Sequence, residues 1–140
     1  METKHQLALV VLILIILITC PTLAFAQKKK EIREAGIKQK IEWRYIYENE
    51  KEIKYKEYEA QFDKQGNILM EKNYDEKGNT VKHIEYKYDG EGNEILQTTF
   101  NSKGEVLERV ETTYSNGFKV EKKVYGPNGK LKSRKVFEYK

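Results

Sequence analysis

The sequence has few residues that could form disulfides or bind metal ions, since its 140 residues include only one Cys and two His. Cys20 lies inside an N-terminal hydrophobic stretch, so residues 21–140 contain no thiol for a disulfide or a thiolate metal site. Beyond that stretch His83 is the single histidine. A metal site in this region would need carboxylates alone. We therefore expect no metal and no cofactor.

Long hydrophobic runs are also missing, apart from one at the N-terminus. Lys4 and His5 precede an unbroken apolar run over residues 7–18, and Ala24-Phe25-Ala26 supplies the small residues that a signal peptidase recognises. Such a run suits a signal peptide and falls short of the roughly 20 residues that cross a bilayer. We predict that residues 1–26 are a signal peptide cleaved after Ala26. The rest would then be secreted, periplasmic or held at the cell envelope.

The sequence also allows two other outcomes for residues 1–26, which we call the leader. Counting on to Ala26 lengthens the apolar stretch to about 20 residues, enough for an uncleaved signal anchor. The segment Leu17-Ile18-Thr19-Cys20 resembles a lipoprotein cleavage box, in which Cys20 would be lipidated. All three fates export the remainder of the chain. Membrane contact is expected only with an uncleaved or lipidated leader.

The charge balance argues against a nucleic-acid partner. The net charge is +4, and the 26 basic residues are interleaved with 22 acidic ones, as in Glu121-Lys122-Lys123. Interleaved charges are typical of a solvated sheet face with protected edges. Residues 27–37 are mostly charged and indicate a linker or one short helix ahead of a domain over residues 38–140.

Glycine recurs every 12 to 14 residues as part of one short motif. In this motif an aromatic residue comes first, Asp or Asn follows, and Gly comes last. The glycines are Gly66, Gly78, Gly92, Gly104, Gly117 and Gly129, and the aspartates are Asp63, Asp75 and Asp89. A type I turn favours Asp first and Gly fourth, and a left-handed Gly there completes a three-residue hairpin loop. Pro127 fits the second position of its turn. Asn116-Gly117 predicts a two-residue type I′ turn.

Between the turns, apolar and charged residues alternate with a period of two. In one such segment Thr80, Lys82, Ile84, Tyr86 and Tyr88 would share a face. Tight turns join antiparallel neighbours, so we predict an all-β antiparallel meander of about eight strands, built from tandem β-hairpin repeats. An open curled sheet, a small barrel and a two-layer arrangement all fit the pattern.

The alternation breaks once, in the strand expected over residues 53–62. Ile53 and Tyr55 share one parity, whereas Tyr58, Ala60 and Phe62 share the other. Either a β-bulge near Lys56-Glu57 or a helical stretch would explain the change. The density of aromatic and branched side chains favours the bulge.

Two segments, Tyr74 to Asn79 and Tyr88 to Asn93, share the motif Tyr-Asp-x-x-Gly-Asn. They resemble the YD repeats of the RHS (rearrangement hot spot) family of bacterial exported proteins. The resemblance covers roughly residues 62–130, and its strict form occurs only twice, since Phe62 and Phe100 replace the tyrosine. In that family the repeats build strips of β-hairpins at the cell surface or shells around a toxin, and carbohydrate binding has been proposed for some. The resemblance thus implies export, a hairpin sheet and surface binding.

The sequence offers no catalytic set. Asp63, Asp75 and Asp89 lack the companion ligands and terminal Glu of an EF-hand, so we interpret them as turn residues. His83 has no Ser or Cys nearby in the sequence and is expected to be a solvated surface residue. We therefore predict that the protein is not an enzyme.

An exported sheet of this kind is best interpreted as a binding or scaffold module at the cell surface or envelope. Exposed aromatic rings could bind glycans there, and the candidates are Tyr86, Tyr88, Tyr74 and Trp43. The alternative is a small periplasmic inhibitor or immunity protein, since short bacterial antitoxin-like proteins contain similar hairpin repeats. The expected partner is accordingly a cell-surface polysaccharide or another protein.

Overall fold

A computed structural model describes residues 21–140 of the chain, so most of the predicted signal peptide lies outside the described residues. Within them, one helix precedes eight strands. The elements are α2 (Pro21–Glu34), β1 (Gln39–Glu48), β2 (Lys51–Phe62), β3 (Ile68–Tyr74), β4 (Thr80–Tyr88), β5 (Glu94–Phe100), β6 (Val106–Ser115), β7 (Phe118–Tyr125) and β8 (Leu131–Val136). In the described part of the chain no helix is both long and apolar enough to cross a membrane.

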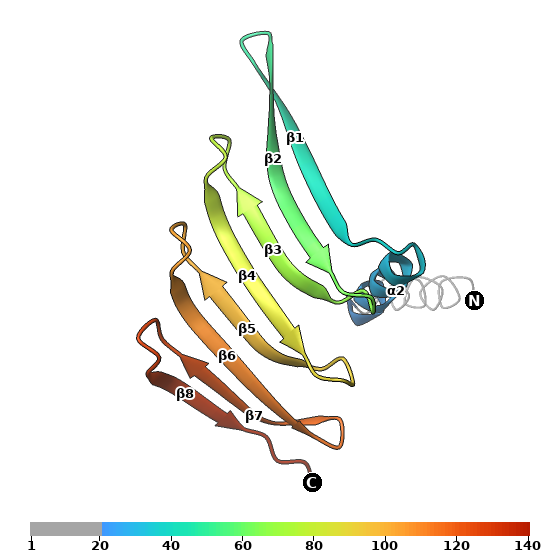
Figure 1. Cartoon of the computed structure of the whole chain (residues 1–140), viewed down its shortest axis with the longest axis vertical. Coiled ribbons are helices and arrows are strands. Elements are labelled where there is room, and N and C mark those ends of the chain that lie inside the picture. Colours follow the sequence, from blue (N-terminus) through green and yellow to red (C-terminus); the bar gives the residue numbers. More distant parts are fainter. Residues whose placement is uncertain (1–20) are drawn as a thin grey trace, which may run out of the picture.

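The eight strands form one antiparallel sheet in which every strand pairs with its neighbours in the sequence (Figure 1). The two edge strands, β1 and β8, lie at opposite sides of the sheet, which stays open. The predicted antiparallel meander is therefore confirmed. Of the three arrangements that the sequence allowed, the structure adopts the open curled sheet.

The repeated turns are held by the Asp that opens them and the Asn that follows the Gly. Gly66 has a φ of +82° and donates its N–H to the Asp63 carbonyl at 3.1 Å. One oxygen of the Asp63 carboxylate accepts the N–H groups of Gln65 and Asn67, and the other accepts the Asn67 side-chain amide at 2.7 Å. The same bonds recur at Asp75 with Asn79 and at Asp89 with Asn93.

Every hairpin from β2 onward contains a bulge near the start of its second strand. Between β3 and β4, Asn73 faces Lys82 and Tyr74 faces Thr80, which leaves Val81 unpaired. The unpaired residues are Leu69, Val81, Ile95, Leu107, Val120 and Lys132. The prediction that Thr80 shares a face with Lys82 is therefore wrong, because the bulge interrupts the alternation. Bulges increase the right-handed twist, which agrees with the coiled sheet in Figure 1.

The bulge predicted in the second strand is confirmed. Glu42 faces Tyr58 and Trp43 faces Lys56, so Glu57 is the extra residue on β2.

Cross-strand partners project from the same face of a sheet, so the register defines two faces. Face A carries Ala60, Glu71 and Ile84, and face B carries Lys72 and His83. The aromatic residues that precede the turns alternate between these faces. Those at the end near α2 lie on face A (Phe62, Tyr88 and Tyr114), and those at the other end lie on face B (Tyr74, Phe100 and Tyr125).

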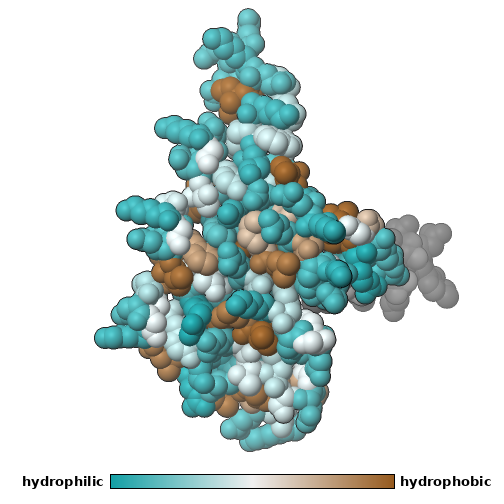
Figure 2. All heavy atoms as spheres, in the orientation of Figure 1, coloured by the Kyte–Doolittle hydropathy of each residue, from teal (hydrophilic) through white to brown (hydrophobic). Residues whose placement is uncertain are grey.

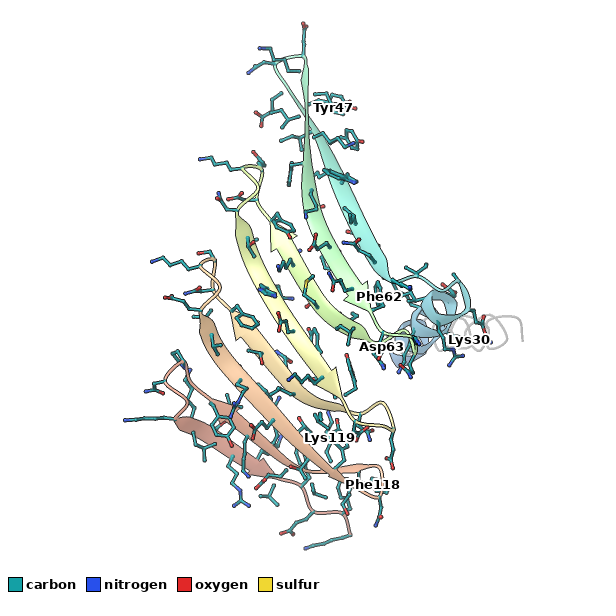
Figure 3. All side chains as sticks on the ribbon, in the orientation of Figure 1. Lys30, Tyr47, Phe62, Asp63, Phe118 and Lys119 are labelled. Atoms are coloured by element: carbon teal, nitrogen blue, oxygen red, sulfur yellow. The ribbon has the colours of Figure 1, made fainter. Side chains whose placement is uncertain are left out.

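The core is small and lies where α2 covers face A at the end of β2. Ile32 packs there against Ala60, which is 0% exposed, and Phe62 (Figure 3). The helix approaches so closely that a Cβ on Gly66 would lie 2.4 Å from the Lys29 carbonyl oxygen. The left-handed Gly36 lies two residues beyond the end of α2, where such a glycine commonly stops a helix. Elsewhere most strand residues remain partly or fully exposed.

Candidate binding surfaces

The hairpin of β1 and β2 projects beyond the rest of the sheet. Pairing of β2 with β3 begins only at Tyr58, whereas β1 and β2 pair all the way to their turn at Glu48 and Lys51. We call the projecting two-stranded ribbon, residues 43–56, the arm (Figure 1). No third strand pairs with the arm, so both of its edges are free, and most of its side chains are exposed on both faces.

A row of exposed aromatic rings follows one face of the arm. Trp43, Tyr45 and Tyr47 are 51%, 46% and 73% exposed and alternate along β1 toward the tip, where Figure 3 shows Tyr47. The Lys54 ammonium lies over the rings of Trp43 and Tyr45, 4.7 and 5.2 Å from their centres. Tyr47 donates its hydroxyl to Glu52 at 2.7 Å, and this bond raises the pKa of Tyr47. We call Trp43, Tyr45 and Tyr47 the aromatic row.

The structure does not bring the four aromatic candidates from the sequence together. Trp43 belongs to the aromatic row, whereas Tyr86 and Tyr88 lie half-buried on face A and Tyr74 lies half-buried on face B. The Tyr86 hydroxyl donates to Glu71 at 3.0 Å, and the Tyr88 hydroxyl donates to the Ile68 carbonyl at 2.9 Å. Burial raises the pKa of Tyr88 to about 12.

Glu71 organises the middle of face A. Its carboxylate accepts hydrogen bonds from Tyr58 at 3.3 Å and Tyr86 at 3.0 Å, and it pairs with Lys82 at 3.0 Å. Burial, followed by the charge of Glu71, raises the pKa of Tyr58 to about 12. Because the Tyr58 and Tyr86 hydroxyls both donate to Glu71, we interpret this part of face A as a network that stabilises the sheet.

On face B a basic or imidazole side chain covers each of the three aromatic rings near the turns. Lys56 lies over Tyr74 at 4.4 Å, Arg109 lies over Tyr125 at 5.0 Å, and the His83 ring stacks on Phe100 with centres 4.5 Å apart. The expectation that His83 is solvated is wrong, since its side chain is only 14% exposed. The register that sets His83 opposite Phe100 explains this burial.

Acidification from about pH 7 to about pH 5.5 is expected to destabilise the protein through His83. Burial, and then repulsion by Lys72, lowers the pKa of His83, while Glu85 and Glu59 oppose that shift. The unfolded chain therefore binds the proton first, and the free energy of unfolding falls as the pH drops below about 6.5. Urea denaturation across this range should show a flatter profile for His83→Gln. An unchanged slope in that variant would assign the titration to another group.

The surface of the protein is hollowed beside α2. A groove of about 540 Å³ lies between the helix and face A and is lined by Ile32, Tyr58, Phe62, Ile68 and Tyr88 among others. Within residues 21–140, no group of three or more His, Cys, Asp or Glu side chains is placed to hold a metal ion. The groove offers apolar contact together with Lys28, Lys29 and Lys40 at its margin.

Hydrophobic residues form several small groups on a mainly hydrophilic surface in the view of Figure 2. No protein-family model matches the chain, and no curated protein matches it significantly.

Proposed function

We propose that the protein is an exported, non-enzymatic binding module that binds glycans at the cell surface or envelope through the aromatic row. The observation that carries the proposal is the exposure of three aromatic rings on an arm that the rest of the sheet leaves open. A folding role would favour at least partial burial, as happens to Tyr86 and Phe100. Their exposure supports a role in contact with a ligand.

The chemistry of the arm suits sugars. Aromatic rings provide an apolar surface for the C–H face of a pyranose ring. The Lys54 ammonium, over two of the rings, and the Glu52 carboxylate and Tyr47 hydroxyl offer hydrogen-bond donors and acceptors for sugar hydroxyls. Successive rings on one strand lie on one side of the arm, so an extended chain could contact more than one of them.

Trp43→Ala/Tyr45→Ala is expected to weaken glycan binding at least tenfold, about 1.4 kcal/mol, because it removes two of the three rings that would contact the sugar. The measurement is binding to a glycan array, followed by titration with the best neutral oligosaccharide. Phe118→Ala/Tyr139→Ala is the matched control, since these two rings are 59% and 61% exposed and contact each other at the far edge. Equal loss in both variants, or no retained glycan, would contradict the proposal.

A partner protein is the second candidate, and the open edge of β1 favours it. In the described chain β1 pairs only with β2, so its outer N–H and C=O groups are free to bind an added strand. Odd-numbered residues of β1 point their backbone groups away from β2, since the Lys38 carbonyl accepts the Phe62 N–H. Copurification of one stoichiometric protein, lost when Gln39 and Ile41 are replaced by proline, would support this function over glycan binding.

A further inference from the structure

The last two strands have a charge pattern that differs from the rest of the protein. Residues 118–140 contain eight Lys or Arg and two acidic residues, Glu121 and Glu138. This segment alone therefore has a net charge above the +4 of the whole chain. The excess positive charge is concentrated on β7, β8 and the residues around them.

Two pairs of basic residues lie directly opposite each other on these strands. Lys123 faces Arg134 on face B, and Lys122 faces Lys135 on face A. Like charges at opposed positions destabilise an antiparallel sheet. On face B, Glu121 compensates, because its carboxylate pairs with Lys123 at 2.7 Å and also with Arg134.

Face A has no such compensation. Among residues 21–140, neither Lys122 nor Lys135 pairs with a carboxylate, and both are exposed. The Lys135 ammonium lies over the ring of Phe137, 5.2 Å from its centre, which leaves its charge unneutralised. Lys119, opposite Tyr114, adds a third exposed cation to the same face. Glu94 on β5 is close enough for Lys119 and Lys122 to affect its pKa, which burial raises, yet it pairs with neither. We call Lys119, Lys122 and Lys135 the lysine cluster.

The side chains that share face A with the lysine cluster are mainly neutral and hydroxyl-bearing. Thr112 faces Lys122, and Ser133 lies one row away opposite Val124. Tyr114 adds one half-exposed ring next to Lys119, and Phe137 adds a second beneath Lys135. Ammonium groups attract acid groups, while hydroxyls and partly exposed rings suit the hydroxyls and ring faces of sugars.

Two other polyanions fit this surface less well. Proteins that bind single-stranded nucleic acid provide successive aromatic rings for the bases. The two rings beside the cluster, Tyr114 on β6 and Phe137 after β8, lie on opposite sides of β7 and form no such row. A membrane surface requires apolar side chains beside the cations. The exposed apolar residues of β8, Leu131 and Val136, face the opposite side, since they lie across from Tyr125 and Glu121.

We propose that the lysine cluster on face A is a binding site for an anionic polysaccharide. The site lies at the edge of the sheet opposite the arm and on the other face from the aromatic row. The proposal goes beyond the function proposed for the arm and rests on a different observation, the uncompensated cross-strand pair of Lys122 and Lys135.

The test is calorimetric titration of the protein with alginate oligosaccharides, with a neutral β-glucan oligosaccharide as the uncharged probe. Lys122→Gln/Lys135→Gln is expected to weaken alginate binding at least about tenfold and to reduce its salt dependence. The control is Lys123→Gln/Arg134→Gln, which removes the same charge from the same two strands on face B and should weaken binding less than about threefold. Circular dichroism checks that both variants are folded. If the control unfolds, Lys119→Gln compared with Lys103→Gln, a turn lysine, replaces the comparison.

Several results would overturn the proposal. Equal weakening by the two double variants would show attraction to net charge without a site. Absence of alginate binding, or tighter binding to an oligothymidylate or to phosphatidylglycerol vesicles, would exclude an anionic polysaccharide as the ligand. The variant Trp43→Ala/Tyr45→Ala should keep its alginate affinity, so failure of the arm and failure of the lysine cluster are distinguishable.

Discussion

Gly66→Ala is expected to lower the free energy of unfolding by about 2–5 kcal/mol, measured by urea denaturation. Two costs combine at this position. A φ of +82° is unfavourable for any L-residue by about 1–2 kcal/mol. The new Cβ would also lie 2.4 Å from the Lys29 carbonyl oxygen, so α2 would have to move away from the sheet.

Gly78→Ala separates these two costs. Gly78 has nearly the same φ, +81°, but a Cβ there meets nothing within 4 Å, so only the backbone cost of about 1–2 kcal/mol remains. Gly90→Ala should cost least, since Gly90 lacks a positive φ and is equally open. If the Gly66 and Gly78 variants unfold at the same urea concentration, the contact between α2 and the turn adds nothing to stability.

Phe62→Ala is expected to cost about 3–5 kcal/mol, the largest effect among the aromatic residues that precede the turns. Phe62 is 8% exposed and is part of the one cluster of buried apolar residues in the described chain, with Ile32 and Ala60. Its removal would leave a cavity beneath α2 and release the helix. Both effects are measurable by urea denaturation and by the loss of helical circular dichroism.

Phe100→Ala is the matched comparison because Phe100 holds the equivalent place in a later hairpin. Phe100 is only half-buried, and the ring of His83 stacks on it. We expect about half the effect of Phe62→Ala and no change in helical signal. Equal losses from the two variants would mean that α2 contributes little to the core.

The sequence predicts the local parts of this fold because their causes are local. Asp63, Gln65, Gly66 and Asn67 form their turn through bonds among themselves, so a short phrase is enough to identify it. The bulge at Glu57 could also be found, since it changes the parity of apolar residues within one strand.

The bulges at the start of the later strands could not be found in this way. Val81 becomes unpaired through the register between β3 and β4, a property of two strands together. The same holds for the open form of the sheet, since alternation along a strand is identical in an open sheet and in a barrel.

The candidate surfaces also depend on relations between strands. Tyr86 and Trp43 look alike in the sequence, yet Tyr86 has a hydrogen-bond partner in Glu71 and Trp43 projects from the arm. The alternation along its own strand places His83 on a charged face, but its cross-strand neighbour is Phe100. In each case the presence and the residues of the neighbouring strand determine whether the ring is buried or exposed. A sequence signal for the arm existed in the length of the first two strands relative to β3.

The alternation of turn aromatics between the two faces limits how such a chain can change its length by gene duplication. Inserting one strand and one turn would reverse the direction of every later strand and exchange the ends of the sheet at which the later turns lie. Each later strand would also turn its two faces over, so that the lysine cluster, now on face A, would lie on face B. A duplicated segment of two strands and two turns restores direction, end and face together. Growth and shrinkage of the sheet should therefore proceed in steps of two strands, the smallest unit that leaves both surfaces unchanged.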